Sequence, residues 1–145
     1  MSVKQISVFL ENRPGCLHEM TNVLAENNID MRGLSLAETS DFGIVRLIVN
    51  DVLNTATVLK DAGFVNSMTP VLAVAVPNVP GGLSKVLGVL DNAGINVEYM
   101  YAITLSGGEN GSAYMILRVT DDAKAEAELR AAGVHIVDQA ELAAL

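Results

Sequence analysis

Hydrophobic and polar residues follow one order along the chain, and the order occurs twice. Apolar runs rich in β-branched residues predict strands, and apolar residues three or four positions apart predict amphipathic helices. In the first half, the predicted strands are 4–10, 30–38, 44–49 and 64–68, with a helical stripe over 17–24 and a helix from Asn54 to Gly63. In the second half, they are 71–76, 96–105, 113–119 and 134–137, with helices over 83–90 and 123–132 and a last helical turn over 139–145.

Residue identities support an internal duplication. Residues 3–34 align without gaps on residues 69–100, and the matches fall on turns, helix ends and apolar positions. We therefore expect two domains, 1–69 and 70–145. The order β-α-β-β-α-β in each predicts an α+β fold of two ferredoxin-like domains, each an antiparallel four-stranded sheet with two helices on one face.

One stretch stands out because the chain contains it twice, each time between a strand and a helix. Its copies are the Asn12 turn, Asn12-Arg13-Pro14-Gly15-Cys16-Leu17, and the Asn78 turn, Asn78-Val79-Pro80-Gly81-Gly82-Leu83. Backbone N–H groups at a helix start carry partial positive charge, and glycine permits close approach, so a small carboxylate can bind there. The alternative is a turn kept only for helix entry, because Pro near the first helical position favours a helix.

Composition narrows the possible functions. The net charge of -8 disfavours nucleic acids and anionic membranes as partners. One cysteine, Cys16, excludes an intrachain disulfide, and no Cys/His cluster has metal-ligand spacing. Half of the residues are hydrophobic, but no apolar run approaches the roughly 20 residues that span a bilayer. We therefore expect a cytoplasmic protein that uses neither a metal nor a cofactor.

The turns and the residues around them resemble the ACT domain family. The resemblance lies in Glu11 followed by the Asn12 turn, in Asn-Asn-Ile-Asp-Met at 27–31, and in the Asn78 turn with Ala-Gly-Ile-Asn-Val at 93–97. Two copies of the pattern together cover the whole chain, so no stretch remains that resembles a catalytic domain. ACT domains are βαββαβ regulatory modules that bind amino acids, usually between paired domains. The plan is similar to stand-alone tandem ACT proteins, to the tandem-ACT regulator of glycine cleavage, and to small regulatory subunits of acetolactate synthase.

The resemblance also implies ligand-binding residues. Members that bind serine or related amino acids use the turn Asn, the N–H groups after it, and a residue at the start of the second strand. Carried over, these pairs are Asn12 with Asp30 and Asn78 with Asn96. Asn offers both a donor and an acceptor, which suits a zwitterion, so the second repeat is the richer site.

Two further features each have a functional and a structural interpretation. Tyr99, Met100 and Tyr101 lie on the strand after the Asn78 turn, and alternation places the tyrosines on one face and Met100 on the other. They shape a ligand pocket or pack between domains. Cys16 lies at a helix start, where a thiolate is favoured, but packing is the stronger interpretation.

The sequence thus predicts a regulatory protein that binds a small amino acid, has no catalytic activity, and controls an enzyme or regulator of amino-acid metabolism. Unpaired sheet edges and the family resemblance predict a homodimer. The first alternative is an interaction module without a ligand, or a regulatory subunit of a biosynthetic enzyme. The second is an acylphosphatase-like hydrolase, which requires a positioned arginine, and Arg13 has only Val79 as its counterpart.

Overall fold

The computed structural model describes residues 2–103 and 112–144. The strands are β1 (Val3–Glu11), β2 (Met31–Glu38), β3 (Phe42–Val49), β4 (Asn66–Pro77), β5 (Val97–Ile103), β6 (Ser112–Val119) and β7 (Ile136–Val137). The helices are α1 (Cys16–Glu26), α2 (Val52–Asp61), α3 (Gly82–Asn92), α4 (Asp122–Ala131) and α5 (Gln139–Ala144). The chain forms two compact units, Lys4–Thr69 and a second unit of Met1–Val3 with Pro70–Leu145.

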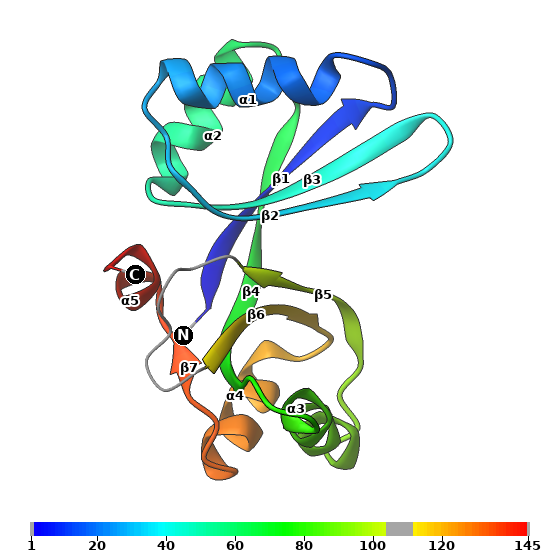
Figure 1. Cartoon of the computed structure of the whole chain (residues 1–145), viewed down its shortest axis with the longest axis vertical. Helices are drawn as coiled ribbons and strands as arrows, with labels where there is room; N and C mark the ends of the chain where they lie inside the picture. Colours follow the sequence, from blue (N-terminus) through cyan, green and yellow to red (C-terminus); the bar gives the residue numbers. More distant parts are fainter. Residues whose placement is uncertain (1, 104–111, 145) are drawn as a thin grey trace. The chain divides into compact units, whose positions relative to one another are not determined.

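The unit Lys4–Thr69 is an antiparallel sheet with two helices on one face (Figure 1). Its strands lie in the order β2-β3-β1, and β4 begins beside β1. In register, Val45 of β3 faces Val8 of β1 on one side and Leu36 of β2 on the other. Alternate residues of β1 and β3 point towards α1 and α2, and the core forms there around Ile6, Met20 and Leu59.

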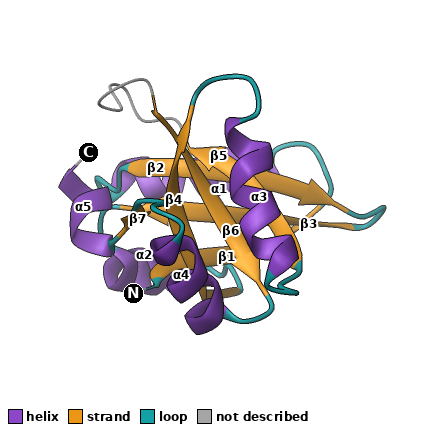
Figure 2. Cartoon of the chain, turned by 90° about the horizontal axis from the view of Figure 1, so that it is seen from below, coloured by secondary structure: helices purple, strands orange, loops and turns teal. Residues whose placement is uncertain are grey.

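The unit that contains Pro70–Leu145 repeats this arrangement. Its strand order is β7-β4-β6-β5, with all pairs antiparallel. The core lies between the sheet and the helices α3 and α4, around Leu72, Leu90 and Leu129. Figure 2 shows the short α5 following β7. The prediction of two ferredoxin-like β-α-β-β-α-β repeats is confirmed.

Two predicted boundaries differ in the structure. The strands expected at 64–68 and 71–76 form one strand, β4, because no turn residue separates them and the fixed φ of Pro70 is compatible with extended backbone. The second helix begins before Asn54, because the Asp51 carboxylate caps it by accepting from the Asn54 N–H at 3.1 Å. The expected end of a strand at Leu105 lies outside the described residues.

No helix in the described ranges is both long and apolar enough to cross a membrane.

Candidate functional site

Each duplicated turn has the backbone of a type II β-turn. In the first, the Cys16 N–H donates to the Arg13 carbonyl at 3.4 Å, and in the second the Gly82 N–H donates to the Val79 carbonyl at 3.0 Å. Pro fits the second position of such a turn, and the third requires positive φ. The two glycines at that position have φ of 91° and 85°. The sequence Pro-Gly therefore fixes how the chain enters α1 and α3.

The helices differ in how their first N–H groups are satisfied. Asp51 caps α2 and Asp121 caps α4, each with its side-chain carboxylate. The N-cap residues of α1 and α3 are glycines and make no side-chain cap. Within the described part of the chain, no group accepts from the backbone N–H of Leu17 and His18, or of Leu83 and Ser84. Two of the four long helices thus begin with donors that are open to a ligand.

A cavity of about 350 Å³ lies at the Asn12 turn. Four residues of the turn line it, and β1, β2 and β3 supply the rest. The lining consists of Leu10, Glu11, Asn12, Arg13, Cys16, Leu17, Leu36, Glu38 and Gly43. Pro14 and Gly15 are not in the lining. Sequence reasoning missed the lining residues that come from β1, β2 and β3, because strand pairing brings them to the turn and the local sequence does not reveal it.

The cavity carries both signs of charge. The Arg13 guanidinium lies 3.0 Å from the Glu11 carboxylate and 3.9 Å from that of Glu19. The hydrogen bond that Arg13 donates to the Glu11 carboxylate, with the negative charges nearby, raises the pKa of Arg13 above its ordinary value. Glu38 lines the opposite wall from β2. A guanidinium and open amides can bind a carboxylate, and the wall carboxylates can bind an ammonium.

Asn12 holds the wall of this cavity in place. Its side-chain amide donates to the Thr39 carbonyl at 3.1 Å, and its backbone N–H donates to the Asp41 carbonyl at 2.9 Å. Both acceptors lie in the turn between β2 and β3. Asn12 therefore positions the β2–β3 turn, and its side-chain donor is already occupied.

Asp30 lies far from the turn in its own unit. It follows the far end of α1, an eleven-residue helix, so about 16 Å of helix separates it from the Asn12 turn. There its carboxylate lies 3.3 Å from the guanidinium of Arg32, and its N–H donates to the side chain of Asn50 at 3.1 Å. The structure does not bring Asp30 together with Asn12 within one unit.

The same separation applies in the second repeat. The Asn96 N–H donates to the Thr120 hydroxyl at 3.2 Å, at the far end of α3. Tyr101 pairs in register with Ile116, whereas Pro77, next to the Asn78 turn, pairs with Ser112, so about 13 Å of strand lies between them.

Tyr99 lies farther still along β5, and Met100 packs against the core. The expectation that these residues and Asn96 close the Asn78 turn does not hold within the unit, because the strand register places them at the other end of the sheet. In the sequence alignment of the two repeats, part of the β2–β3 segment that lines the first cavity corresponds to residues 104–111, which are not described. Val79 in this turn is 62% exposed.

Cys16 is a core residue. It is buried with Met20 and Leu24 on the inner face of α1, and its side chain also borders the cavity. Packing therefore accounts for Cys16.

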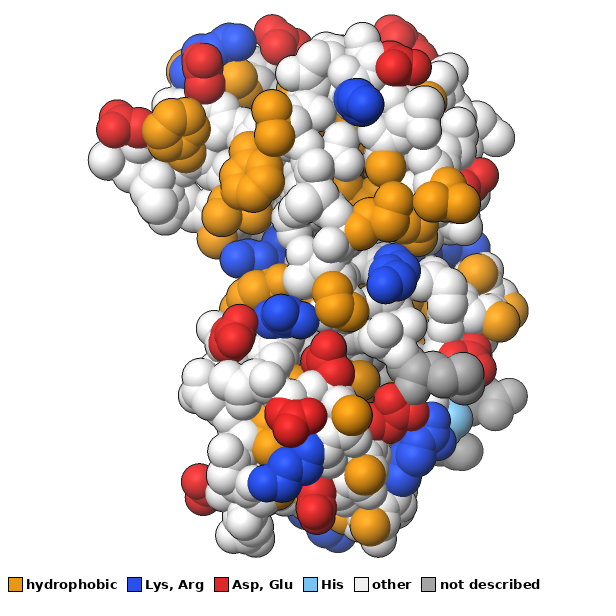
Figure 3. Space-filling model, turned by 180° about the vertical axis from the view of Figure 1, so that it is seen from behind, with side chains coloured by type: hydrophobic (Ala, Val, Ile, Leu, Met, Phe, Trp, Pro, Cys, Tyr) orange, Lys and Arg blue, Asp and Glu red, His pale blue; other side chains and the backbone are white. Residues whose placement is uncertain are grey.

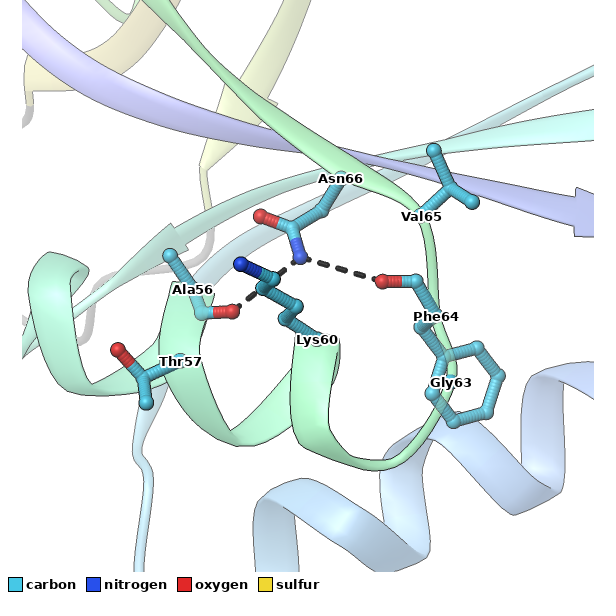
Figure 4. A pocket seen from close by; sticks show the side chains of 7 residues that line it. All are labelled: Ala56, Thr57, Lys60, Gly63, Phe64, Val65 and Asn66. Carbon is cyan, nitrogen blue, oxygen red and sulfur yellow. Dashed lines mark hydrogen bonds between the residues drawn. The ribbon is translucent and has the colours of Figure 1, made fainter.

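The cavity of about 470 Å³ on the outer side of α2 is larger but chemically simpler. Its seven lining residues are shown in Figure 4, where the Asn66 amide donates to the carbonyls of Ala56 and Phe64, each at 3.3 Å. Lys60 is its one charged residue. With no acidic group in its lining, this groove matches a zwitterion less well than the cavity at the Asn12 turn. No three His, Cys, Asp or Glu side chains in the described ranges gather to hold a metal ion.

Comparisons with known proteins agree with this architecture. A family model described as an ACT domain pair matches residues 1–145. A crystal structure of a Bacteroides thetaiotaomicron protein is 40% identical, with 100% of this chain and 98% of that chain covered and a TM-score of 0.91.

The regulatory subunits of aspartate kinase from Thermus thermophilus and Thermus flavus share the fold. They are 16% and 17% identical, with TM-scores of 0.65 and 0.63, and 90% of each chain is covered in both cases. No curated protein matches the chain.

Proposed function

Because the chain belongs to the ACT domain family, as an ACT domain pair over residues 1–145, we propose that it is a regulatory protein that binds a small amino acid. Binding takes place at the Asn12 turn, and the protein has no catalytic activity of its own. ACT domains are regulatory modules, and the Thermus proteins of the same fold are regulatory subunits of a kinase. We place this chain in the control of an enzyme or regulator of amino-acid metabolism.

The observation that carries the proposal is the uncapped start of α1, which opens into a cavity lined by both signs of charge. A helix start whose N–H groups have no acceptor is a binding site for an anion. The other helix of the same unit, α2, has its first turn closed by Asp51. The difference leaves α1 available to a ligand.

An α-amino acid fits this cavity in one orientation. Its carboxylate accepts from the open amides of Leu17 and His18 and lies near Arg13. Its ammonium faces the carboxylate of Glu38. Its side chain packs against Leu10 and Leu36, which favours a small or aliphatic side chain. The Asn78 turn, with Val79, Pro80, Gly81, Gly82 and Leu83, offers the same open amides, and the proposal extends to it as a second site.

The residues carried over from the family fit a homodimer. Asp30, Asn96 and the Tyr99–Tyr101 segment lie far from the turn of their own unit, and they belong to or adjoin the edge strands β2 and β5. They reach a ligand only if a second chain places its edge strand next to the turn. A homodimer paired through these edges supplies that contact.

The alternative is an interaction module without a ligand. It is supported by exposed apolar side chains on the outer sheet face of the unit Lys4–Thr69, where Phe9 is 45%, Phe42 58% and Val65 68% exposed. Hydrophobic atoms gather over this part of the molecule in Figure 3. Such a face marks a site for a protein partner.

Thermal unfolding and calorimetry across the twenty amino acids test the proposal. A ligand at 100 times its Kd adds about 2.7 kcal/mol of stability. We expect the substitution Arg13→Gln to weaken the response, and Arg130→Gln, which removes a comparable cation from α4, to leave it unchanged. If no amino acid shifts the unfolding transition, the proposal is wrong. Partner capture that is independent of every amino acid then supports the interaction module.

A further inference from the structure

The unit that contains Pro70–Leu145 has a cavity of its own, distinct from the cavities described in the unit Lys4–Thr69. It has a volume of about 250 Å³ and lies between α3, the end of β4 and the turn from α4 to β7. Val86 forms a buried part of the wall, and Val89 and Val134 are half-buried in it. The polar members of the lining are Lys85, Ser112 and His135. The cavity is thus an apolar hollow with a small polar rim.

The rim carries one positive charge for which the described residues supply no counterion. The His135 ring nitrogen Nε2 lies 2.7 Å from the Glu141 carboxylate, so any charge on that ring is already compensated. No described residue forms an ion pair or hydrogen bond with the Lys85 ammonium. None of the lining residues is acidic. An anionic group therefore has a partner in this cavity, and an ammonium has none.

The other repeat gives an internal comparison. The equivalent cavity of the unit Lys4–Thr69 has about 290 Å³ and is lined by Glu11, Arg13 and Glu19 among others. Glu19 occupies the position that Lys85 occupies in the second repeat. The guanidinium of Arg13 there is already engaged by both carboxylates, at 3.0 and 3.9 Å. The first repeat therefore has two carboxylates beside its cation at the place where the lining of the second has no carboxylate.

We propose that the cavity beside Lys85 binds a short aliphatic carboxylate that lacks an ammonium group, such as a 2-oxo acid. The carboxylate lies at the Lys85 ammonium, and the Ser112 hydroxyl donates to a ligand oxygen. The alkyl chain packs against Val86, Val89 and Val134. Pockets for drug-sized ligands have about 300–1,000 Å³, so this smaller cavity suits a ligand of a few carbon atoms.

This site is independent of the amino-acid site proposed at the Asn12 turn. It lies in the other unit, and its lining has positive charge only, whereas the cavity at the Asn12 turn has both signs. A chain with both sites senses an amino acid and a carboxylate without the amine through different residues. Either site can be present without the other.

A nuclear magnetic resonance titration of the full ¹⁵N-labelled chain tests the inference. The probes are 3-methyl-2-oxobutanoate and L-valine, which have the same carbon skeleton and differ in the α-group. We expect the oxo acid to cause saturable shifts in the amides of 85–89 and 132–135. Valine leaves these amides unchanged, whatever it does at the open amides of the Asn12 and Asn78 turns.

Three variants sharpen the test. Lys85→Gln is expected to weaken oxo-acid binding by roughly fivefold to tenfold, because an exposed charge-assisted contact is lost. Lys60→Gln, on α2, is the matched control and leaves binding unchanged. Val89→Phe adds bulk at a half-buried position of the wall, and we expect it to narrow the cavity and weaken oxo-acid binding while the other amide signals stay in place.

The inference is overturned by any of three results. The first is the absence of saturable shifts in unit Pro70–Leu145 with the oxo acid. The second is unchanged affinity in Lys85→Gln. The third is equal binding of valine at the same amides, which contradicts the selection against an ammonium. Shifts at the Asn12 turn with valine bear on the amino-acid site alone.

Discussion

Three glycines within α3 and the turn before it respond differently to the same substitution. Gly81 has φ of 85°, in the left-handed region that costs an alanine about 1–2 kcal/mol. Alanine also reduces the entropy of the unfolded chain, which returns about 0.4–1 kcal/mol. Gly81→Ala is therefore expected to lower the free energy of unfolding by about 1 kcal/mol.

Gly88→Ala in the same helix is the matched control, with the opposite sign. A Cβ on Gly88 meets no heavy atom within 4 Å, and alanine is favoured over glycine inside a helix by about 1 kcal/mol. Gly82→Ala is the severe case, because the added Cβ would overlap the Pro77 carbonyl oxygen. Relieving that contact requires backbone movement and costs roughly 1–3 kcal/mol.

Differential scanning calorimetry of the three variants measures this order. Gly88→Ala should unfold at a higher temperature than the parent chain, Gly81→Ala at a lower one, and Gly82→Ala at or below Gly81→Ala. At roughly 4 °C per kcal/mol, the first two variants should differ by about 8 °C. Equal stability of Gly81→Ala and the parent chain contradicts the turn geometry described above, and a loss of stability in Gly88→Ala contradicts the open space around Gly88.

Further predictions concern helix caps, a half-buried carboxylate and the cavity wall. Asp51→Ala and Asp121→Ala each lose an N-cap and should destabilise the chain by about 1 kcal/mol in urea unfolding, whereas caps without energetic weight would leave the midpoint unchanged. Burial raises the pKa of Asp122 above its ordinary value of 3.8, against the lowering effect of Arg118. A carboxyl with a raised folded pKa is favoured when protonated, and this stability is lost as the pH rises through that pKa. Asp122→Asn should therefore be more stable than the parent chain at pH 7, and this advantage should disappear at a pH below 3.8, the ordinary pKa of the carboxyl. An advantage that is equally large at pH 7 and below pH 3.8 refutes this. Asn12→Ala removes the donor to Thr39, so the amides of the β2–β3 turn should exchange with solvent faster, and unchanged exchange there argues against its positioning role.

The order of elements was readable from the sequence because each element has a local pattern. Apolar stripes at Leu17, Met20 and Leu24 determine a helical face, and the repeated Pro-Gly determines the turn before it. These signals need no knowledge of distant residues. The two β-α-β-β-α-β repeats and their turns follow from them.

The parts that could not be predicted depend on register or on competition between caps. Leu36 and Glu38 reach the cavity only because of how β2 pairs with β3, and strand pairing is not encoded locally. The same pairing moves Tyr101 away from the Asn78 turn. Asp and Asn are both good N-cap residues, so the sequence alone does not decide between Asp51 and Asn54 as the cap of α2. In the folded chain Asp51 is the cap, and Asn54 lies inside the helix.

Each repeat has one helix with a side-chain N-cap and one helix without, and this difference has an evolutionary consequence. Asp51 and Asp121 cap α2 and α4 without a contribution from α1 or α3, so substitutions at the uncapped starts of α1 and α3 leave both caps in place. The duplication thus gave the chain two uncapped helix starts. The equivalent residues Glu19 and Lys85 have opposite charge, which shows that the two helix starts have already diverged. Selectivity in one half can change while the other half retains its ancestral role.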